Sequence, residues 1–252
     1  MDSYIGFARL YDEFMTNIPY EKWGNYINNV LRKQLTGTEN PLVVDLACGT
    51  GTMTLFLANK GFDMIGVDMS MDMLAEAQQK SYAAGHQILF LAQDMRKLDL
   101  FGTVDAMVSV CDGINYILTP EDLSTVFNRV RLFLNPGGIF IFDMNTEYKF
   151  KELLGQQSFE AKTESGAAYE WDNHYDENTK TNEYRVLFYS QANSQENEPF
   201  TETHRQRAYD VDNIARMLKD AGFSSVSAYH NYTDESVRID SPRITLIAEV
   251  DK

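Results

Sequence analysis

Short apolar runs alternate with longer amphipathic segments between Leu42 and Asn145. This alternation is typical of βα units whose strands pair in a parallel sheet. The apolar runs predict strands at Leu42–Ala47, Asp63–Asp68, Ile88–Asp94, Asp105–Cys111 and Ile139–Asp143. We therefore expect an α/β fold with helices on both faces of the sheet.

Helix start and stop signals separate these strands. Ser70 can cap a helix that runs to Gly85, and Thr119 followed by Pro120 marks the start of another helix. Glycine is the residue that most easily takes the left-handed conformation found just after helices. Three glycines stand where such residues are expected, at Gly61, Gly85 and Gly137.

The pattern predicts one domain over residues 1–252 with four parts. Residues 1–40 carry periodic apolar positions that predict a helical lid, and residues 41–150 carry the strands of the core. Alternating polar and aromatic residues over 156–209 predict an inserted antiparallel sheet that caps the substrate. Residues 210–252 predict a helix capped by Asp210 and two antiparallel edge strands, Phe223–Tyr232 and Arg243–Val250. The main sheet then has seven strands.

Charge and cysteine content narrow the function classes. The net charge of −15 repels phosphate backbones and makes nucleic acid a disfavoured partner. The only cysteines, Cys48 and Cys111, are too few for a disulfide framework and indicate a reducing cytoplasm. The start lacks a secretory pattern, and no apolar stretch reaches the roughly 18 residues that span a bilayer. We expect a cytoplasmic monomer or homodimer with no membrane partner and no metal.

The strongest motif is Asp45-Leu46-Ala47-Cys48-Gly49-Thr50-Gly51, which follows the first predicted strand and precedes a helix. Glycines in a first βα turn let a ligand approach the backbone, although many α/β proteins use such glycines only to turn. Asp68 ends the second strand, close to the roughly 20-residue spacing at which a carboxylate accepts both hydroxyls of a ribose. The alternative is that Asp68 caps the next helix, but Ser70 is available for that. A nucleoside cofactor is the favoured interpretation.

The residues around this turn favour S-adenosylmethionine (SAM) over a dinucleotide. A dinucleotide fingerprint needs a third glycine where this chain has Thr54. SAM has no pyrophosphate, and the acidic Asp45 suits its cationic amino-acid end. Asp94, at the end of the third strand, can accept a hydrogen bond from the exocyclic amine of adenine, while Met95 offers a backbone N–H.

The run from Asp45 through Asp68 and Asp94 to Cys111 resembles motifs I to IV of the class I SAM-dependent methyltransferases. Two further segments resemble a largely uncharacterised bacterial branch of small-molecule methyltransferases, Phe7-Ala8-Arg9-Leu10-Tyr11-Asp12 and Glu170-Trp171-Asp172-Asn173 with His204 and Arg207. The resemblance implies a Rossmann-like sheet of order 3-2-1-4-5-7-6. One departure is Ala47, where the fuller motif often has glycine.

The resemblance also implies a set of cofactor contacts. Asp45, Gly49 and Gly51 would bind the methionine end, Asp68 the ribose and Asp94 the adenine. Tyr4 and Tyr11 would close over the cofactor. The implied cofactor-binding set is completed by Cys48, Met69, Met95 and Cys111.

Methyl transfer from a sulfonium is an in-line displacement, so no fixed catalytic residue is expected, although a base can contribute roughly 100- to 10,000-fold. The candidate bases are His204 and Asp112. Candidate substrate-binding residues are Asn115, Tyr116, Trp171, His174 and Arg207. Alternation places His204 and Arg207 on opposite faces of one strand, and only one face can line a pocket. Structural roles remain open for each, and Asp112 and Asn115 can equally satisfy a turn.

The leading hypothesis is a SAM-dependent methyltransferase acting on N or O of a small molecule. A rival is a SAM-binding module that acts by interaction with another protein and methylates nothing. A less favoured rival is an NAD(P)-dependent oxidoreductase, which the missing third glycine opposes. A nucleobase target is disfavoured by the charge and by the lack of an Asn/Asp-Pro-Pro-Tyr/Phe motif.

Overall fold

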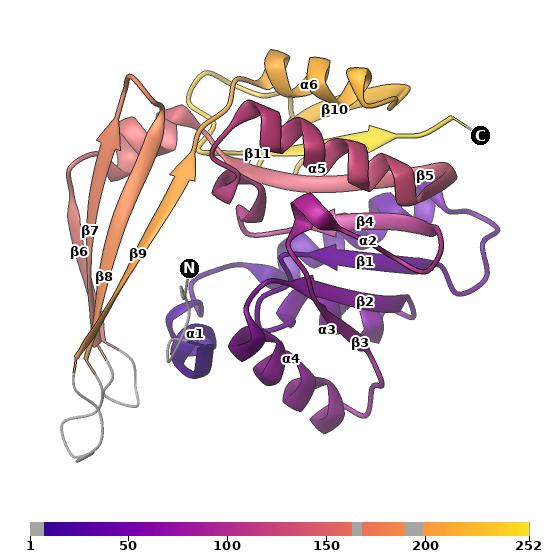
Figure 1. Cartoon of the computed structure of the whole chain (residues 1–252), viewed down its shortest axis with the longest axis horizontal. Coiled ribbons are helices and arrows are strands. Elements are labelled where there is room, and N and C mark those ends of the chain that lie inside the picture. The colour runs from indigo at the N-terminus through magenta and orange to yellow at the C-terminus, as the bar shows by residue number, and fades with distance from the viewer. Residues whose placement is uncertain (1–7, 163–167, 190–198, 252) are drawn as a thin grey trace.

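The computed structural model describes residues 8–162, 168–189 and 199–251. Its main sheet has seven strands in the order β3-β2-β1-β4-β5-β11-β10 (Figure 1). In chain order they are β1 (Leu42–Leu46), β2 (Asp63–Asp68), β3 (Leu89–Ala92), β4 (Val104–Ser109), β5 (Leu134–Asn145), β10 (Ser225–His230) and β11 (Arg243–Glu249). Pairing is parallel among β1 to β5, and β11 is antiparallel to β5 and β10. The predicted order 3-2-1-4-5-7-6 is confirmed.

The direction of strand addition reverses at β1. This strand pairs with β2 on one side, where Leu46 faces Val67, and with β4 on the other, where Val43 faces Ala106. Open α/β sheets bind ligands in the crevice beyond the carboxyl ends of the strands at such a reversal. The glycine-rich turn after β1 therefore lies at the expected ligand site.

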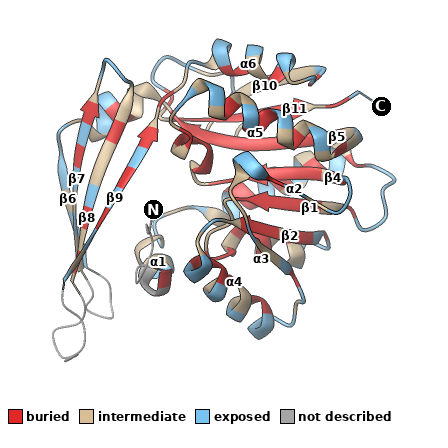
Figure 2. Ribbon diagram, in the orientation of Figure 1, coloured by how far each residue is buried: buried red, intermediate tan, exposed pale blue. Residues whose placement is uncertain are grey.

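Helices cover both faces of the sheet, as predicted. The main ones are α2 (Tyr20–Gln34), α3 (Thr52–Asn59), α4 (Met71–Ala83), α5 (Pro120–Phe133) and α6 (Val211–Asp220). Neighbouring residues of β5 face the helices on opposite sides of the sheet. Phe140 packs with Phe127 of α5, while Ile141 packs in the cluster that contains Ile27 of α2. Buried residues follow the strands as a result (Figure 2). Among the described helices, none is both long and apolar enough to cross a bilayer.

Most of the predicted caps are confirmed. The Ser70 hydroxyl accepts a hydrogen bond from the backbone N–H of Met73, and the Asp210 carboxylate accepts one from Asp212. Gly61 and Gly85 follow their helices with φ angles of 84° and 78°.

Gly137 was predicted to end a helix, and this is wrong. Its φ is 75°, but α5 already ends at Phe133 and β5 begins at Leu134 without a loop between them. The predicted end of β4 also moves, from Cys111 to Ser109. Cys111 and Asp112 have φ angles of 65° and 58°, which an extended strand cannot contain.

The insert after β5 is a separate antiparallel sheet, as predicted. Its strands are β6 (Ser158–Lys162), β7 (Ala168–Asp176), β8 (Thr181–Tyr189) and β9 (Phe200–Arg207), in that spatial order. Helix α1 (Ala8–Phe14) lies between this sheet and the core (Figure 1). Ala8 packs in one cluster with Met73 of α4 and Phe188 of β8. Short helical turns η1 (Met95–Lys97), η2 (Gly113–Tyr116) and η3 (Lys149–Leu154) complete the described fold.

Candidate cofactor and acceptor site

The glycine-rich turn folds sharply after β1. Ala47, Gly49 and Gly51 have φ angles of 57°, 53° and 74°. A Cβ on Gly51 would lie 2.9 Å from the Cβ of Ala77 in α4, so only glycine fits there, whereas a Cβ on Gly49 would meet no atom within 4 Å. Gly51 is thus needed for packing, and Gly49 faces open space that a ligand can fill.

Ala47 takes the conformation that a glycine would take. A left-handed alanine is strained by roughly 1–2 kcal/mol. Its methyl group has room because residue 113 is glycine, where a Cβ would lie only 2.8 Å from the Cβ of Ala47. The departure from the family motif is therefore accommodated by a second glycine, and it brings the turn into contact with the loop after β4.

Asp45 lies beneath the turn rather than on its surface. It is 1% exposed, and the Thr54 hydroxyl donates a hydrogen bond of 2.6 Å to its carboxylate. Burial raises the pKa of Asp45 to about 7. Thr54 thus replaces the third glycine of a dinucleotide fingerprint with a partner for Asp45. The contact of Asp45 with the methionine end stays a prediction.

The carboxylate of Asp68 bonds to the glycine turn and to Ser70, which itself caps α4, and the contact of Asp68 with a ribose stays a prediction. Its carboxylate accepts backbone hydrogen bonds of 2.9 Å from Gly49 and from Ser70. Burial raises the pKa of Asp68, and these N–H donors offset part of the rise. A carboxylate has about four acceptor positions, so these backbone N–H groups leave room for a ribose hydroxyl. Met69 follows with 62% of its surface exposed, an apolar area beside the same site.

The side chain of Asp94 is held by a neighbour. Arg96 Nε donates to Asp94 Oδ2 at 2.9 Å, and Nη2 donates to the same oxygen at 2.5 Å. The Arg96 side chain lowers the pKa of Asp94. Met95 begins the short turn η1 and is half-buried. The adenine contact of both residues stays a prediction, in which Asp94 would share its oxygens with Arg96.

A pocket, here called the insert pocket, opens between α1, the inserted sheet and the ends of β4 and β5. Six of the predicted site residues line it: Tyr11 and Cys111 from the cofactor set, Tyr116 and Trp171 from the substrate set, and the candidate bases Asp112 and His204. The remaining lining residues are Phe14, Met15, Asn17, Ile18, Asn145, Lys149, Leu154, Tyr169, Tyr184, Val186, Phe188, Gln206 and Arg243. Tyr4 lies outside the described residues.

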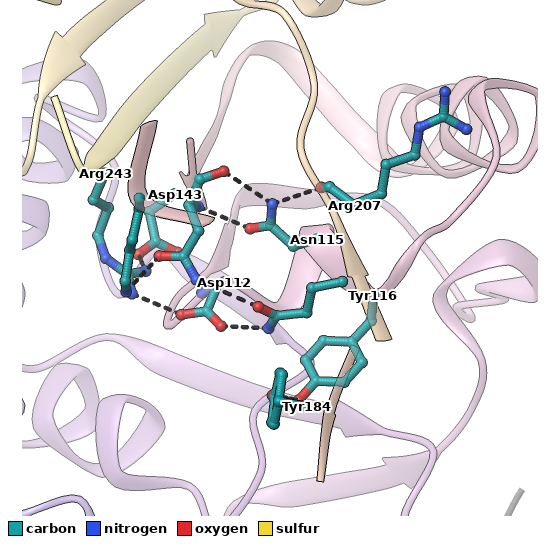
Figure 3. Close-up of polar contacts among 10 residues, drawn as sticks. Asp112, Asn115, Tyr116, Asp143, Tyr184, Arg207 and Arg243 are labelled. Atoms are coloured by element: carbon teal, nitrogen blue, oxygen red, sulfur yellow. Dashed lines mark hydrogen bonds and ion pairs between the residues drawn. The ribbon is translucent and has the colours of Figure 1, made fainter. Parts of the chain in front are cut away.

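Three predicted substrate-binding residues lie outside the insert pocket. Asn115 is fully buried and joins three backbone groups: its amide donates to Asn145 O at 3.1 Å and to Arg207 O at 2.8 Å, and its oxygen accepts from Asn145 N at 2.9 Å. This is the structural alternative weighed for Asn115. Arg207 donates to Leu118 O at 2.9 Å and points away from the pocket (Figure 3).

His174 is the third of these residues, and strand alternation explains its place. On β7 Trp171 lines the pocket, while His174, three residues on, lies on the opposite face. Its ring is exposed and bonds to Gln156 at 2.9 Å. The same rule separates His204 from Arg207 on β9.

A charged cluster that sequence reasoning missed forms one end of the pocket. Arg243 Nη2 donates to Asp112 Oδ1 at 2.7 Å, and Arg243 Nη1 forms a short ion pair with Asp143 (Figure 3). Gln206 donates to the other Asp112 oxygen at 2.5 Å. One oxygen of Asp112 is therefore paired with a cation and the other with an amide, which disfavours Asp112 as the base. Lys149 donates to Asn145 at 2.8 Å, and burial lowers the pKa of Lys149.

The sequence held a signal for this cluster. Asp143 and Arg243 are ionisable residues inside apolar strand runs, and such residues need a partner when buried. The antiparallel register places Arg243 of β11 opposite Asn145 of β5. Asn145 and Asp143 lie two residues apart on β5. Only the register of β11 on β5 brings Arg243 and Asp143 together, and the sequence alone did not provide it.

His204 lies on the wall that the inserted sheet contributes. Its Nε2 is 3.2 Å from Glu202 Oε2, and its Nδ1 is 3.2 Å from the hydroxyl of Tyr116. The Tyr116 hydroxyl is 2.6 Å from that of Tyr184, whose ring stacks on His204 at 4.9 Å.

The class I SAM-dependent methyltransferases are defined by a sheet of this order. A glycine turn follows its first strand, and acidic residues end the second strand and follow the third. The sequence profile of the Methyltransferase domain family matches residues 43–138. The chain is 35% identical over 250 residues to YqeM of Bacillus subtilis (strain 168), which is classed as a methyltransferase, and the match covers 99% of this chain and 98% of YqeM. The chain belongs to the SAM-dependent methyltransferase superfamily.

Solved structures share the whole fold, including the insert. A SAM-dependent methyltransferase from Clostridium acetobutylicum ATCC 824 is 28% identical with a TM-score of 0.87, covering 99% of each chain. The sugar N-methyltransferase KedS8 from Streptoalloteichus sp. ATCC 53650 is 19% identical with a TM-score of 0.78, covering 96% of this chain and 93% of KedS8. The second likeness shows the fold alone.

Proposed function

We propose that this chain transfers the methyl group of SAM to the nitrogen of a small-molecule amine held in the insert pocket. One observation carries the proposal, namely that the glycine turn touches the pocket loop. A Cβ at Gly113 would lie 2.8 Å from that of Ala47, and the neighbouring Asp112 lines the pocket. A cofactor on the turn and an acceptor in the pocket would therefore be adjacent.

The residues at the turn fit SAM. Gly49 faces open space, Asp68 keeps acceptor positions for ribose hydroxyls, and Met69 offers apolar surface. When bound, SAM supplies an electrophilic methyl group on a sulfonium. The protein's part is to align the acceptor with that methyl group. Such alignment can lower the activation free energy by on the order of 7–11 kcal/mol. In this proposal α1 and the inserted sheet select the acceptor.

The lining of the insert pocket favours an amine. Tyr11, Trp171 and Tyr184 offer aromatic rings, whose faces attract cations. An imidazole takes a proton from an ammonium group far more readily than from an aliphatic hydroxyl, and His204 lines the pocket. KedS8 shows that a chain of this fold, insert included, acts as a sugar N-methyltransferase.

The proposal is tested by turnover. Purified protein is incubated with SAM and a panel of small amines, each matched with the corresponding alcohol and carboxylic acid, and formation of S-adenosylhomocysteine is measured. We expect product with one or more amines and none with their alcohol partners. Product only with alcohols or acids would overturn the choice of nitrogen. SAM binding with no acceptor methylated would instead favour an interaction module.

A further inference from the structure

The pocket-facing side of β9 carries three buried polar side chains. Glu202, His204 and Gln206 are 5%, 4% and 2% exposed. They alternate along the strand and so lie on one face. Burying a carboxylate is costly unless it is paired, and Glu202 has His204 as a partner at 3.2 Å. The pair is therefore built into the wall of the pocket rather than exposed at its rim.

The contacts of His204 indicate which ring nitrogen carries its hydrogen. A carboxylate oxygen 3.2 Å from Nε2 favours the neutral tautomer with its hydrogen on Nε2. Its Nδ1 is then the basic nitrogen and accepts from the Tyr116 hydroxyl at 3.2 Å. The Tyr116 hydroxyl in turn meets the Tyr184 hydroxyl at 2.6 Å. Hydrogen bonds thus connect His204 through Tyr116 to Tyr184, and Glu202 lies within ion-pair distance of the other ring nitrogen of His204.

His204 is poorly placed to touch an acceptor itself. One nitrogen faces Glu202 and the other faces Tyr116, while Tyr184 stacks on the ring with an interplanar angle of 17°. Tyr116, Tyr184 and His204 all line the insert pocket, and Glu202 does not. Because both nitrogens of His204 already face partners, an acceptor would reach His204 through the two tyrosines.

We propose that Tyr184, Tyr116 and His204 form a proton relay for the acceptor, with Glu202 as a positioning residue. The inference rests on the proposed amine methylation. An ammonium acceptor gives its proton to the Tyr184 oxygen, Tyr184 gives its own proton to Tyr116, and Tyr116 gives its proton to His204 Nδ1. The freed nitrogen lone pair forms the N–C bond while the C–S bond breaks and its electrons stay on sulfur. The imidazolium pairs with Glu202 until it releases the proton to solvent.

The first test does not depend on the acceptor. Long-range ¹H–¹⁵N correlation spectra of the full chain report which nitrogen of His204 carries hydrogen. We expect the Nε2–H form in the wild type and in the control Glu183→Gln, whose glutamate pairs with Arg205 on the other face at 2.6 Å. Glu202→Gln is expected to lose this preference. A neutral His204 with hydrogen on Nδ1 would overturn the relay, because Nδ1 could not accept a proton.

The second test uses the amine found by the acceptor panel and its β,β,β-trifluorinated analogue, whose nitrogen is mostly neutral at a mildly alkaline assay pH. Tyr184→Phe is expected to lower kcat by about 100-fold with the parent amine but only a few-fold with the analogue, which needs no proton removed before attack. KM for SAM should not change. The control Tyr189→Phe removes a hydroxyl that bonds Glu170 at 2.8 Å, outside the pocket, and should match the wild type with both amines.

Equal losses with both amines would show that Tyr184 only shapes the pocket, and no loss would show that it is not needed; either result overturns the relay. Failure of every amine in the panel would overturn the proposed function instead. The spectra of His204 would still decide the relay's first link in that case.

Discussion

Arg243 Nη2 lies 2.7 Å from Asp112 Oδ1, although 131 residues separate the two in sequence. The pair connects the first residue of β11 to the loop after β4. It helps to hold Cys111 and Asp112 in their left-handed conformations, together with a hydrogen bond of 2.9 Å from Asp112 N to Asp143 Oδ1. Strained non-glycine residues persist only where surrounding contacts fix them. The shape of the insert pocket near the proposed methyl position therefore depends on the last strand of the sheet.

Replacing Arg243 tests this dependence. Arg243→Met leaves the fully buried Asp143 and the adjacent Asp112 without their cation. Loss of one partner of a buried ion pair lowers the free energy of unfolding by roughly 3–5 kcal/mol. Urea denaturation measures the change, and Arg238→Met, at an exposed ion pair with Glu235, is the control and should change little. Equal stabilities of the two variants would contradict the role of Arg243.

The buried carboxyl of Asp45 predicts a pH dependence of stability. Burial raises its folded-state pKa from 3.8 to about 7. At a pH between these two values, the folded state therefore holds a proton that the unfolded state has lost. The free energy of unfolding should therefore fall as pH rises from about 4 to 7. Asp45→Asn should remove this part of the decline. Urea denaturation at pH 5 and pH 8 measures it, and identical pH dependence of the two proteins would disprove it.

Asp68 is predicted to carry much of the affinity for SAM. Asp68→Ala should weaken binding by about 1–3 kcal/mol, the cost of leaving ribose hydroxyls without a charged acceptor. Isothermal titration calorimetry with SAM and S-adenosylhomocysteine measures the change. Asp72→Ala, on the exposed first turn of α4, is the matched control. Asp68→Ala also removes the hydrogen bonds from Gly49 and Ser70, so the thermal midpoint of each variant is measured first to show that it is folded. Unchanged affinity for SAM in a folded Asp68→Ala protein would refute the ribose contact.

The contact between Ala47 and Gly113 predicts a compensating pair of substitutions. Gly113→Ala places a Cβ 2.8 Å from that of Ala47 and should destabilise the protein by roughly 1–3 kcal/mol. Adding Ala47→Gly removes the opposing methyl group and should restore much of the loss. Thermal unfolding of the single and double variants measures this coupling. Gly102→Ala, which meets no atom within 4 Å, is the control. Additive effects of the two substitutions would rule out the contact.

The sequence alone determined the local structure of the protein. Helix caps at Ser70 and Asp210 and the turn at Gly49 and Gly51 depend on residues close in sequence, whose conformational preferences act over a few positions. The family resemblance then provided the strand order. Gly137 was misjudged because its left-handed conformation serves β5 rather than the end of α5.

Only the tertiary structure decided which side chains meet. Alternation showed that His204 and Arg207 lie on opposite faces of β9, but the face that lines the insert pocket depends on how the inserted sheet packs against α1. The pairing of Arg243 with Asp112 and Asp143 depends in the same way on the register of β11 against β5. Periodicity is a local property of the chain, whereas a buried ion pair or a pocket is made by segments that only folding brings together.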